Sequence, residues 1–387
     1  MPDIDAGVSR IVRNLLHYKP VDKDIQYAVV LIRRNDQKEI QVTETLDADE
    51  VIRFNYREDE NPFVVFRRLS KTLKSEHDII VGNDGLEIKM VVTQHLKNPV
   101  LYIVHGDFPD YYNIVNNYYP VINSIVAYST KIEKSLLKMP GIDKVKVHKI
   151  YYPANIKQSF IKSKSENSGR FKIVFAGMLV ERKGAELLPL IYDGLVERGM
   201  HEFDFKIIGD GELYSFLKTS CERFHQIVLT GWKDHAYVQE AMQQADVFLF
   251  PSRLEGLPNV LIEALAAGAV PVVTNLESGV RDIIQHDLNG LLVEADDIAG
   301  YCEAILKLYN NREHLERLRL NSKGSLGMFA PYAQAKAYED LAIETAKKEN
   351  NKETVFPNYK RGRFLDRKWI PNWLLITIRK IIKNPKL

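Results

Sequence analysis

Residues 171–179 read FKIVFAGML, an almost continuous apolar run. Five similar runs follow it: FDFKIIG (203–209), IVLTG (227–231), DVFLFPS (246–252), PVVTN (271–275) and GLLVEA (290–295). A stretch with helical periodicity separates each run from the next, which is the pattern of βαβ units on a parallel sheet. Because the runs are apolar throughout, we expect strands that are buried on both faces of the sheet.

The first part of the chain repeats this alternation less regularly. Its apolar runs are YAVVLIR (27–33), DIIVGND (78–84), VLYIVHG (100–106), SIVAYS (124–129) and VKVHKIYY (145–152). The sequence therefore predicts an α/β protein with two Rossmann-like parallel-sheet domains. The expected division is a first domain at 1–154, a linker at 155–170, a second domain at 171–330, a helix returning toward the first domain at 331–350 and a basic amphipathic tail at 351–387. The first helix, expected over Gly7–Leu16, has no apolar strand before it.

The composition excludes several classes of protein. Apolar residues make up 45% and charged residues 27% of the 387 residues, which excludes collagenous, disordered and disulfide-rich chains. With 53 Lys and Arg against 51 Asp and Glu, the net charge of +2 gives no drive toward nucleic acid. Two cysteines distant in sequence favour a reducing cytosol. We see no targeting segment and no apolar run that would span a bilayer.

The stretch PSRLEGLPNVLIEALAAG (251–268) carries the strongest chemical signal. A helix should begin near Pro258 and end at Gly268, with Glu263 on a buried face. A buried carboxylate needs hydrogen-bond donors, and the two hydroxyls of a ribose would supply them. The amides at the helix N-terminus would stabilise a diphosphate, and Glu255 would bond sugar hydroxyls. Spacing alone is equally consistent with Glu263 bonding a neighbouring backbone group or arginine, and with Glu255 as a solvated loop charge.

Glu255 and Glu263, in this context, resemble the paired-glutamate motif of the retaining glycosyltransferases of family 4. That family has the GT-B fold, in which two Rossmann-like domains face a central cleft. Three further segments of the second domain are similar to the family, FAGMLVERKG (175–184), IIGDGEL (207–213) and VLTGWKD (228–234). In the first domain, IVAYSTKIEKSLLK and KIYYPANI resemble the end of the acceptor half, so the similarity covers about Gly7 to Leu341.

The resemblance implies roles for individual residues. Lys183, with Arg182, would hold the pyrophosphate, Glu263 the ribose, and Glu255 the donor sugar. The remaining donor-binding positions are Gly209, Gly256, Leu257, Asn259 and Val260. His105 matches a histidine that lies near the reacting sugar, which makes His105, Glu255 and Lys183 the expected catalytic residues. A core or strand-end histidine satisfied by its neighbours explains His105 equally well without the family.

The sequence departs from the family pattern at two loops. Gly177 is followed by Met178 where the family usually has Gly-Arg, so Arg182 would have to replace one phosphate-binding cation. The opening Gly-Gly loop is reduced to Ala6-Gly7. The Asp-x-Asp at Asp3–Asp5 lies at the extreme N-terminus, so we expect no metal site there, and no cofactor beyond the donor itself.

These observations predict a retaining, metal-independent glycosyltransferase. It would move a sugar from a nucleotide diphosphosugar to a glycan or lipid-linked acceptor in cell-surface polysaccharide assembly. The alternative is a non-catalytic nucleotide-sugar-binding or membrane-docking protein with the same fold. A dehydrogenase is disfavoured because GDGELY (209–214) has Tyr214 where the third glycine of the dinucleotide fingerprint belongs.

The last 28 residues, 360–387, hold nine Lys and Arg and one Asp, a charge of +8 that leaves −6 for the rest of the chain. On a helical wheel, one arc contains Leu374, Leu375, Ile378, Ile381 and Ile382, and the opposite arc contains Arg379, Lys380 and Lys383. Trp369 and Trp373 lie nearby. Such a helix can lie on an anionic membrane, on the inner face of the plasma membrane for a cytoplasmic protein, or dock on the protein's own acidic body.

Overall fold

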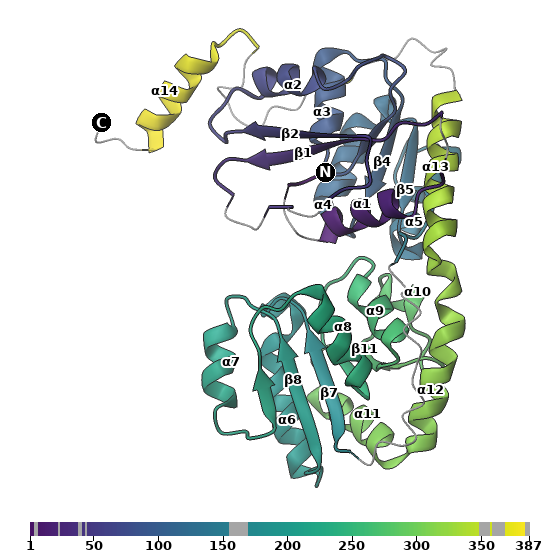
Figure 1. Ribbon diagram of the computed structural model, residues 1–387. Helices are drawn as coiled ribbons and strands as arrows, with labels where there is room; N and C mark the ends of the chain where they lie inside the picture. Colours follow the sequence, from purple (N-terminus) through teal and green to yellow (C-terminus); the bar gives the residue numbers. More distant parts are fainter. Residues whose placement is uncertain are drawn as a thin grey trace. The chain divides into compact units, whose positions relative to one another are not determined.

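Figure 1 shows the computed structural model of the protein. The structure describes residues 1–3, 7–21, 24–37, 41–42, 45–154, 169–347, 357 and 368–383, without the side chains of residue 323 and residues 380–383. The chain divides into two compact units. Unit 1 contains residues 1–128, 132–153 and 331–387, and unit 2 contains residues 129–131 and 154–330.

Unit 2 is built on one six-stranded parallel sheet with the order β12-β11-β10-β7-β8-β9. The strands are β7 (Phe171–Ala176), β8 (Phe203–Ile208), β9 (Ile227–Leu229), β10 (Val247–Phe250), β11 (Val270–Thr274) and β12 (Leu291–Val293). All six strands predicted from the apolar runs are confirmed. Side chains of β7, β8, β10, β11 and β12 contribute to one hydrophobic core with the helices of the unit.

The strand order places a topological switch point between β7 and β10, because the chain builds outward from β7 in one direction and from β10 in the other. In open α/β sheets, ligands bind at such a point, outside the carboxyl ends of the strands. The connecting helices are α6 (Leu188–Glu197), α7 (Tyr214–Cys221), α8 (His235–Gln244), α9 (Asn259–Ala267), α10 (Val280–Ile283), α11 (Ile298–Asn310) and α12 (Arg312–Ser325).

Arg319 of α12 is a fully buried cation that joins three elements of unit 2. Its Nε donates to the carbonyl of Gly268 at 2.7 Å, and Nη2 lies 3.2 Å from Oδ1 of Asp246. Asp246 precedes β10, and its other oxygen accepts from the amide of Lys172 in β7 at 2.9 Å. The buried pair therefore fixes α12 and the end of α9 against the two strands that flank the switch point.

Unit 1 contains a four-stranded parallel sheet, β3-β4-β5-β6, and a parallel pair, β1-β2. The strands are β1 (Ala28–Arg34), β2 (Glu50–Tyr56), β3 (Ile80–Gly82), β4 (Val100–Val104), β5 (Ser124–Ala127) and β6 (Val147–Lys149). The five predicted strands are confirmed, whereas the apolar-run criterion missed β2. EVIRFNY alternates exposed and half-buried positions and buries only Phe54, so it lacks the apolar continuity of the other strands.

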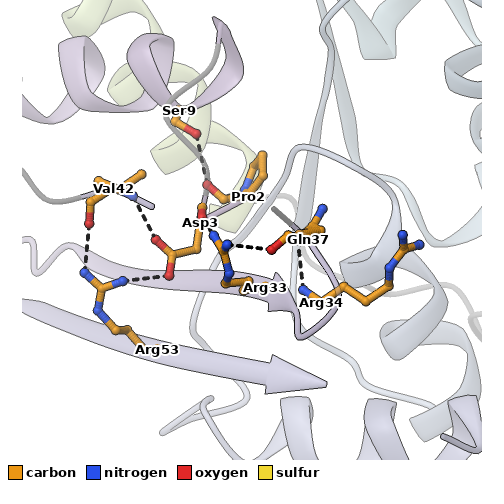
Figure 2. A network of polar contacts seen from close by, with 8 residues as sticks. All are labelled: Pro2, Asp3, Ser9, Arg33, Arg34, Gln37, Val42 and Arg53. Atoms are coloured by element: carbon orange, nitrogen blue, oxygen red, sulfur yellow. Dashed lines mark hydrogen bonds and ion pairs between the residues drawn. The ribbon is translucent and has the colours of Figure 1, made fainter. Parts of the chain in front are cut away.

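The N-terminal residues lie beside β1 in place of a full first strand. Pro2 forms an isolated parallel bridge with Ile32, and the amide of Asp3 donates to the carbonyl of Ile32 at 2.8 Å. The buried Asp3 carboxylate accepts from the amide of Val42 at 3.2 Å and pairs with Arg53 at 2.6 Å (Figure 2). Asp3 therefore serves in a structural network, and Asp5 lies outside the described residues.

The helices of unit 1 come from both ends of the chain. They are α1 (Gly7–His17), α2 (Pro62–Ser70), α3 (Leu86–Gln94), α4 (Pro109–Tyr118), α5 (Thr130–Leu137), α13 (Pro331–Lys347) and α14 (Asn372–Lys383). On α13, the buried Thr345 hydroxyl lies 2.8 Å from Ser124 of β5, and Tyr338 donates to the carbonyl of Ile150 at 3.3 Å. No helix among the described residues combines the length and the apolar character needed to cross a bilayer.

The expected placement of Arg379 on the arc opposite Leu375 is wrong, since residues four apart lie on the same side of a helix and both are buried. The Arg379 side chain is buried, and Nη1 donates to the carbonyl of Glu60 at 2.9 Å. The buried guanidinium is tolerated because the Glu60 carbonyl supplies a hydrogen-bond acceptor. The expectations for the side chains of Lys380, Ile381, Ile382 and Lys383 fall outside the described residues.

We predict that Arg319→Met destabilises unit 2 by about 3–5 kcal/mol, because it leaves the buried Asp246 carboxylate with only the half-exposed Arg312, 3.8 Å away, as a cation. Urea unfolding measures the loss. The matched control is Arg317→Met on the same helix, whose half-exposed side chain lies 3.5 Å from Asp287 and whose loss should cost less than about 1 kcal/mol. Equal losses for the two variants would show that Arg319 is no more than a surface charge.

Candidate active site

Two loops meet at the carboxyl edge of the switch point, one after β7 and one after β10. The first includes the short 3-10 helix Glu181–Lys183 and ends at Gly184, and the second begins at Pro251. Gly184 has φ +65°, and a Cβ added there would lie 2.2 Å from the carbonyl oxygen of Pro251. Only glycine fits this approach, because any side chain would collide with the backbone of the neighbouring loop.

This approach brings Lys183 and Glu255 together, 72 residues apart in sequence. Lys183 Nζ lies 2.5 Å from Glu255 Oε1, and both side chains are largely buried. The buried Ser252 hydroxyl donates to the same carboxylate oxygen at 2.5 Å. A buried charge is costly unless an opposite charge lies beside it, and Lys183 and Glu255 supply that opposite charge to each other. The Lys183 ammonium group thus lies next to the Glu255 carboxylate at the carboxyl edge of the sheet, where ligands of open α/β sheets bind.

Arg182 and Arg253 fix the backbone around this pair. The amide of Arg253 donates to the carbonyl of Arg182 at 2.9 Å, and the Arg182 guanidinium donates to the carbonyl of Leu254 at 3.1 Å. Arg253 also pairs with Asp296 at 2.7 Å and with Glu186. The sequence analysis did not single out Arg253, because nothing in its local pattern shows that its partners follow β7 and β12. Met178, at the position of the missing cation, is exposed.

Helix α9 begins where the second loop ends. Pro258 occupies the N-cap position with no side-chain cap, and Gly268 ends the helix at φ +80°, which confirms the predicted bounds. In such a helix the first amides have no partner within the helix and point outward with the positive end of the dipole. Glu263 is 8% exposed, so its carboxylate is held inside unit 2.

The remaining predicted positions of this loop are fixed by its neighbours. The carbonyl of Gly256 accepts from the amide of Gly279 at 2.7 Å, and a Cβ on Gly279 would lie 2.4 Å from that carbonyl. Leu257 is buried, and Asn259 and Val260 are half-buried at the start of α9. Backbone contact therefore determines the shape of the loop that carries Glu255.

Gly209 supports the loop after β7. Its φ is +150°, and a Cβ there would lie 1.9 Å from the carbonyl oxygen of Gly177. The amide of Gly177 donates to the carbonyl of Ile208 at 3.0 Å, and the amide of Leu179 donates to the carbonyl of Asp210 at 2.9 Å. The glycine of this turn thus permits two adjacent strand ends to lie in contact.

His105 follows β4 in unit 1, so it belongs to a different unit from Lys183 and Glu255. Its Nε2 lies 2.7 Å from Oδ1 of Asn83, and its Nδ1 is hydrogen-bonded to the hydroxyl of Tyr128. Burial and, secondarily, the positive N-terminus lower the pKa of His105 to about 3. The imidazole is therefore neutral near pH 7, and both of its nitrogens are oriented by protein groups. Sequence reasoning missed Asn83 and Tyr128, which follow or end other strands of the sheet.

Within the part of the chain that the structure describes, no group of three or more His, Cys, Asp or Glu residues is arranged to hold a metal ion. The positive charge near Glu255 comes from Lys183, the arginines of the two loops and the N-terminus of α9. Any anion bound at this edge would meet these groups first.

We predict that Gly184→Ala destabilises unit 2 more than Gly199→Ala does. Both glycines have positive φ, +65° and +84°, but a Cβ at Gly199 meets nothing within 4 Å. Gly199→Ala should cost about 1–2 kcal/mol from backbone strain alone, and Gly184→Ala about 1–3 kcal/mol more from the clash. Urea unfolding compares the two variants, and equal losses would refute the close approach of the loops.

Comparisons with known proteins agree with this geometry. Residues 156–325 match the family "Glycosyl transferases group 1". The lipopolysaccharide 1,6-galactosyltransferase of Escherichia coli is 26% identical over 56% of this chain and 59% of its own length. A UDP-Gal:alpha-D-GlcNAc-diphosphoundecaprenol alpha-1,3-galactosyltransferase of Escherichia coli is 30% identical over 28% of each chain. In sequence, the chain spans well under two thirds of the curated relatives it matches.

Solved structures resemble the chain over a longer span. HepE of Anabaena, determined in complex with UDP, has a TM-score of 0.71 and 14% identity, and the match covers 88% of this chain and 97% of that one. At this identity the likeness concerns the fold, which is GT-B with two parallel-sheet units. In sequence, residues 156–325 are similar to the group 1 glycosyl transferases, and the strand order and the structural likeness give the chain a GT-B fold.

Proposed function

We propose that this protein is a glycosyltransferase that moves a sugar from a nucleotide diphosphosugar to a glycan or lipid-linked acceptor. The observation that carries the proposal is the buried Lys183–Glu255 pair at the switch point, beside the start of α9. This edge of an open parallel sheet is where nucleotides bind, and its charges suit a diphosphate and a sugar.

Lys183 and the N-terminus of α9 are the proposed diphosphate site. When the glycosidic bond of the donor breaks, negative charge develops on the departing diphosphate, and a preorganised cation and helix dipole stabilise that charge. Lys183 would exchange Glu255 for the phosphate oxygens as the donor enters. Arg182 would add a second cation, because one bond to Leu254 leaves other guanidinium N–H groups for a ligand.

Glu255 and Glu263 are proposed to accept hydrogen bonds from the sugar and ribose hydroxyls of the donor. Glu255, released from Lys183, would accept hydrogen bonds from the sugar while Ser252 keeps one of its oxygens oriented. Glu263 would accept from the ribose hydroxyls, since an ionised carboxylate is an acceptor on both oxygens. Gly209, Gly256, Leu257, Asn259 and Val260 would line the remainder of the donor site. With these roles, we propose that the chain acts as a retaining glycosyltransferase of the family 4 type.

His105 is proposed to contact the reacting sugar as a neutral, oriented group. A pKa of about 3 leaves almost no imidazolium at neutral pH, so the residue would not serve as a proton donor there. Its place would be to shape the sugar site through hydrogen bonding and contact, with Asn83 and Tyr128 holding the ring.

The acceptor and setting are proposed from the relatives and the thiols. Two relatives carry names for lipopolysaccharide and diphosphoundecaprenol galactosyltransferases, which supports a glycan or lipid-linked acceptor in cell-surface polysaccharide assembly. UDP is the nucleotide to test first, since it occupies several structures of the same fold. Cys221 and Cys302 are both buried free thiols, which agrees with a reducing, cytoplasmic setting.

The alternative is a protein that binds nucleotide sugars without turnover, since Met178 stands where the resemblance to family 4 leads us to expect an arginine. Thermal unfolding with uridine, guanosine, thymidine and adenosine diphosphates identifies the nucleotide, because a ligand that binds the native state raises its stability. Turnover with the matching sugar donors and a mixed acceptor set then separates the two functions.

We predict that Lys183→Ala lowers kcat/KM by about 10²–10³-fold and weakens UDP binding far less, because the lost charge acts mainly in the transition state. Steady-state kinetics and calorimetry measure the two effects. The control is Lys307→Ala, a half-exposed lysine of unit 2 that pairs with Asp287 and should leave both values unchanged. Equal losses in kcat/KM and in affinity would limit Lys183 to ground-state binding.

We also predict that the product keeps the anomeric configuration of the donor and that activity persists in EDTA. Retention follows from the resemblance to family 4, and metal independence follows from the cationic groups around the proposed diphosphate site. Proton NMR of the product reports the configuration. An inverted product contradicts the first expectation, and complete loss of activity in EDTA, restored by added Mg²⁺ or Mn²⁺, contradicts the second.

A further inference from the structure

The C-terminal helix α14 is fixed to unit 1 through one of its faces. Asn61, the N-cap residue of α2, donates from Nδ2 to the carbonyl of Ile370 at 2.7 Å. Its backbone amide donates to Oδ1 of Asn372 at 2.7 Å. These two bonds set the position at which α14 begins, shown in yellow in Figure 1.

The next turns continue the same attachment. Leu375 is fully buried, and Arg379, four residues later on the same helix face, is buried and donates to the carbonyl of Glu60. The inner face of α14 is therefore satisfied by unit 1 itself. Because a basic residue is used on this face, the helix differs from a simple amphipathic wheel in which all cations face solvent.

Two tryptophans remain on the outside of this attachment. Trp369 is 77% exposed and Trp373 is 69% exposed, and we call the two the tryptophan pair. They are four residues apart, and the exposed Lys368 lies next to Trp369. Large aromatic side chains exposed together mark an interaction surface more often than they mark ordinary protein surface.

The charge of this segment indicates the partner. The tryptophan pair lies within residues 360–387, whose nine Lys and Arg against one Asp give +8, while the rest of the chain carries −6. Basic residues are attracted to anionic lipid headgroups, and tryptophan favours the boundary between headgroups and hydrocarbon. An acidic protein partner would satisfy the charge but gives no particular reason for paired tryptophans.

We infer that α14 is a docked helix that holds the protein on an anionic lipid bilayer through Trp369, Trp373 and the neighbouring Lys368, with the net charge of +8 in residues 360–387 favouring an anionic surface. The inner face of the helix secures it to unit 1, and the outer side enters the interface without crossing the membrane. This inference does not depend on sugar transfer, because the contacts and charges that carry it lie outside the donor site.

The test compares the full chain with the double variant Trp369→Ala/Trp373→Ala. Cosedimentation uses vesicles of phosphatidylcholine alone and of phosphatidylcholine mixed with phosphatidylglycerol. The wild type should bind the mixed vesicles, more weakly as salt is raised, and should not bind the neutral ones. The double variant should bind at least tenfold more weakly. Trp232→Ala, which removes a tryptophan of unit 2 that is 61% exposed, is the matched control and should bind like the wild type.

A second variant separates charge from the aromatic contribution. Lys368→Glu should weaken binding severalfold and raise its dissociation constant most at low salt, because it reverses one exposed charge. The thermal unfolding midpoint and the affinity for UDP should remain those of the wild type in the double variant and in Lys368→Glu. This keeps a failure of the membrane inference distinguishable from a failure of the proposed donor site.

Four outcomes overturn the inference. They are a wild type that ignores anionic vesicles, a double variant that binds as well as the wild type, a Trp232→Ala loss equal to that of the double variant, and a lowered unfolding midpoint in the double variant. The last would mean that the tryptophans pack inside unit 1. A self-association that the double variant abolishes, without vesicle binding by the wild type, would assign the surface to a second copy of the chain.

Discussion

The contact of the loops after β7 and β10 is the constraint on which the candidate site depends. Gly184 lies so near the carbonyl of Pro251 that a methyl group would not fit, and the amide of Arg253 joins the two loops through the carbonyl of Arg182. A larger separation would leave Lys183 and Glu255 as two solvated charges. At the observed separation they form a largely buried pair at the edge of the sheet.

The sheet of unit 2 makes this contact possible and holds it in place. Its strand order puts β7 next to β10, although 70 residues lie between the end of β7 and the start of β10. The buried Arg319–Asp246 pair ties α12 to the start of β10, and Lys172 in β7 shares the same carboxylate. A stable core, rather than the loops themselves, thus determines where the charges of the site are presented. This arrangement suits electrostatic stabilisation, which requires groups fixed before the reaction begins.

Unit 1 contains an oriented, neutral histidine. His105 is held neutral near pH 7 by burial, and Asn83 and Tyr128 bond its two ring nitrogens. The same unit carries α14, whose inner face is occupied by contacts with Glu60 and Asn61. The Lys183–Glu255 pair belongs to unit 2 and the tryptophan pair to unit 1.

The sequence by itself determined those strands and helix ends that have a local signal, such as a continuous apolar run or a proline or glycine at a helix end. The apolar runs of unit 2 predicted all six strands, and Pro258 and Gly268 predicted both ends of α9. It also pointed to Lys183 and Glu255, although their pairing depends on the strand order. β2 was missed because its polar residues interrupt the apolar run that marks the other strands. The role of Arg253 was missed because its partners are distant in sequence. Only the tertiary structure decided that Arg379 is buried and that the ring of His105 is held on both sides. The periodicity of a segment indicates which of its side chains are buried and which are exposed. The contacts of Arg379 and His105 join segments distant in sequence, so they depend on the tertiary fold.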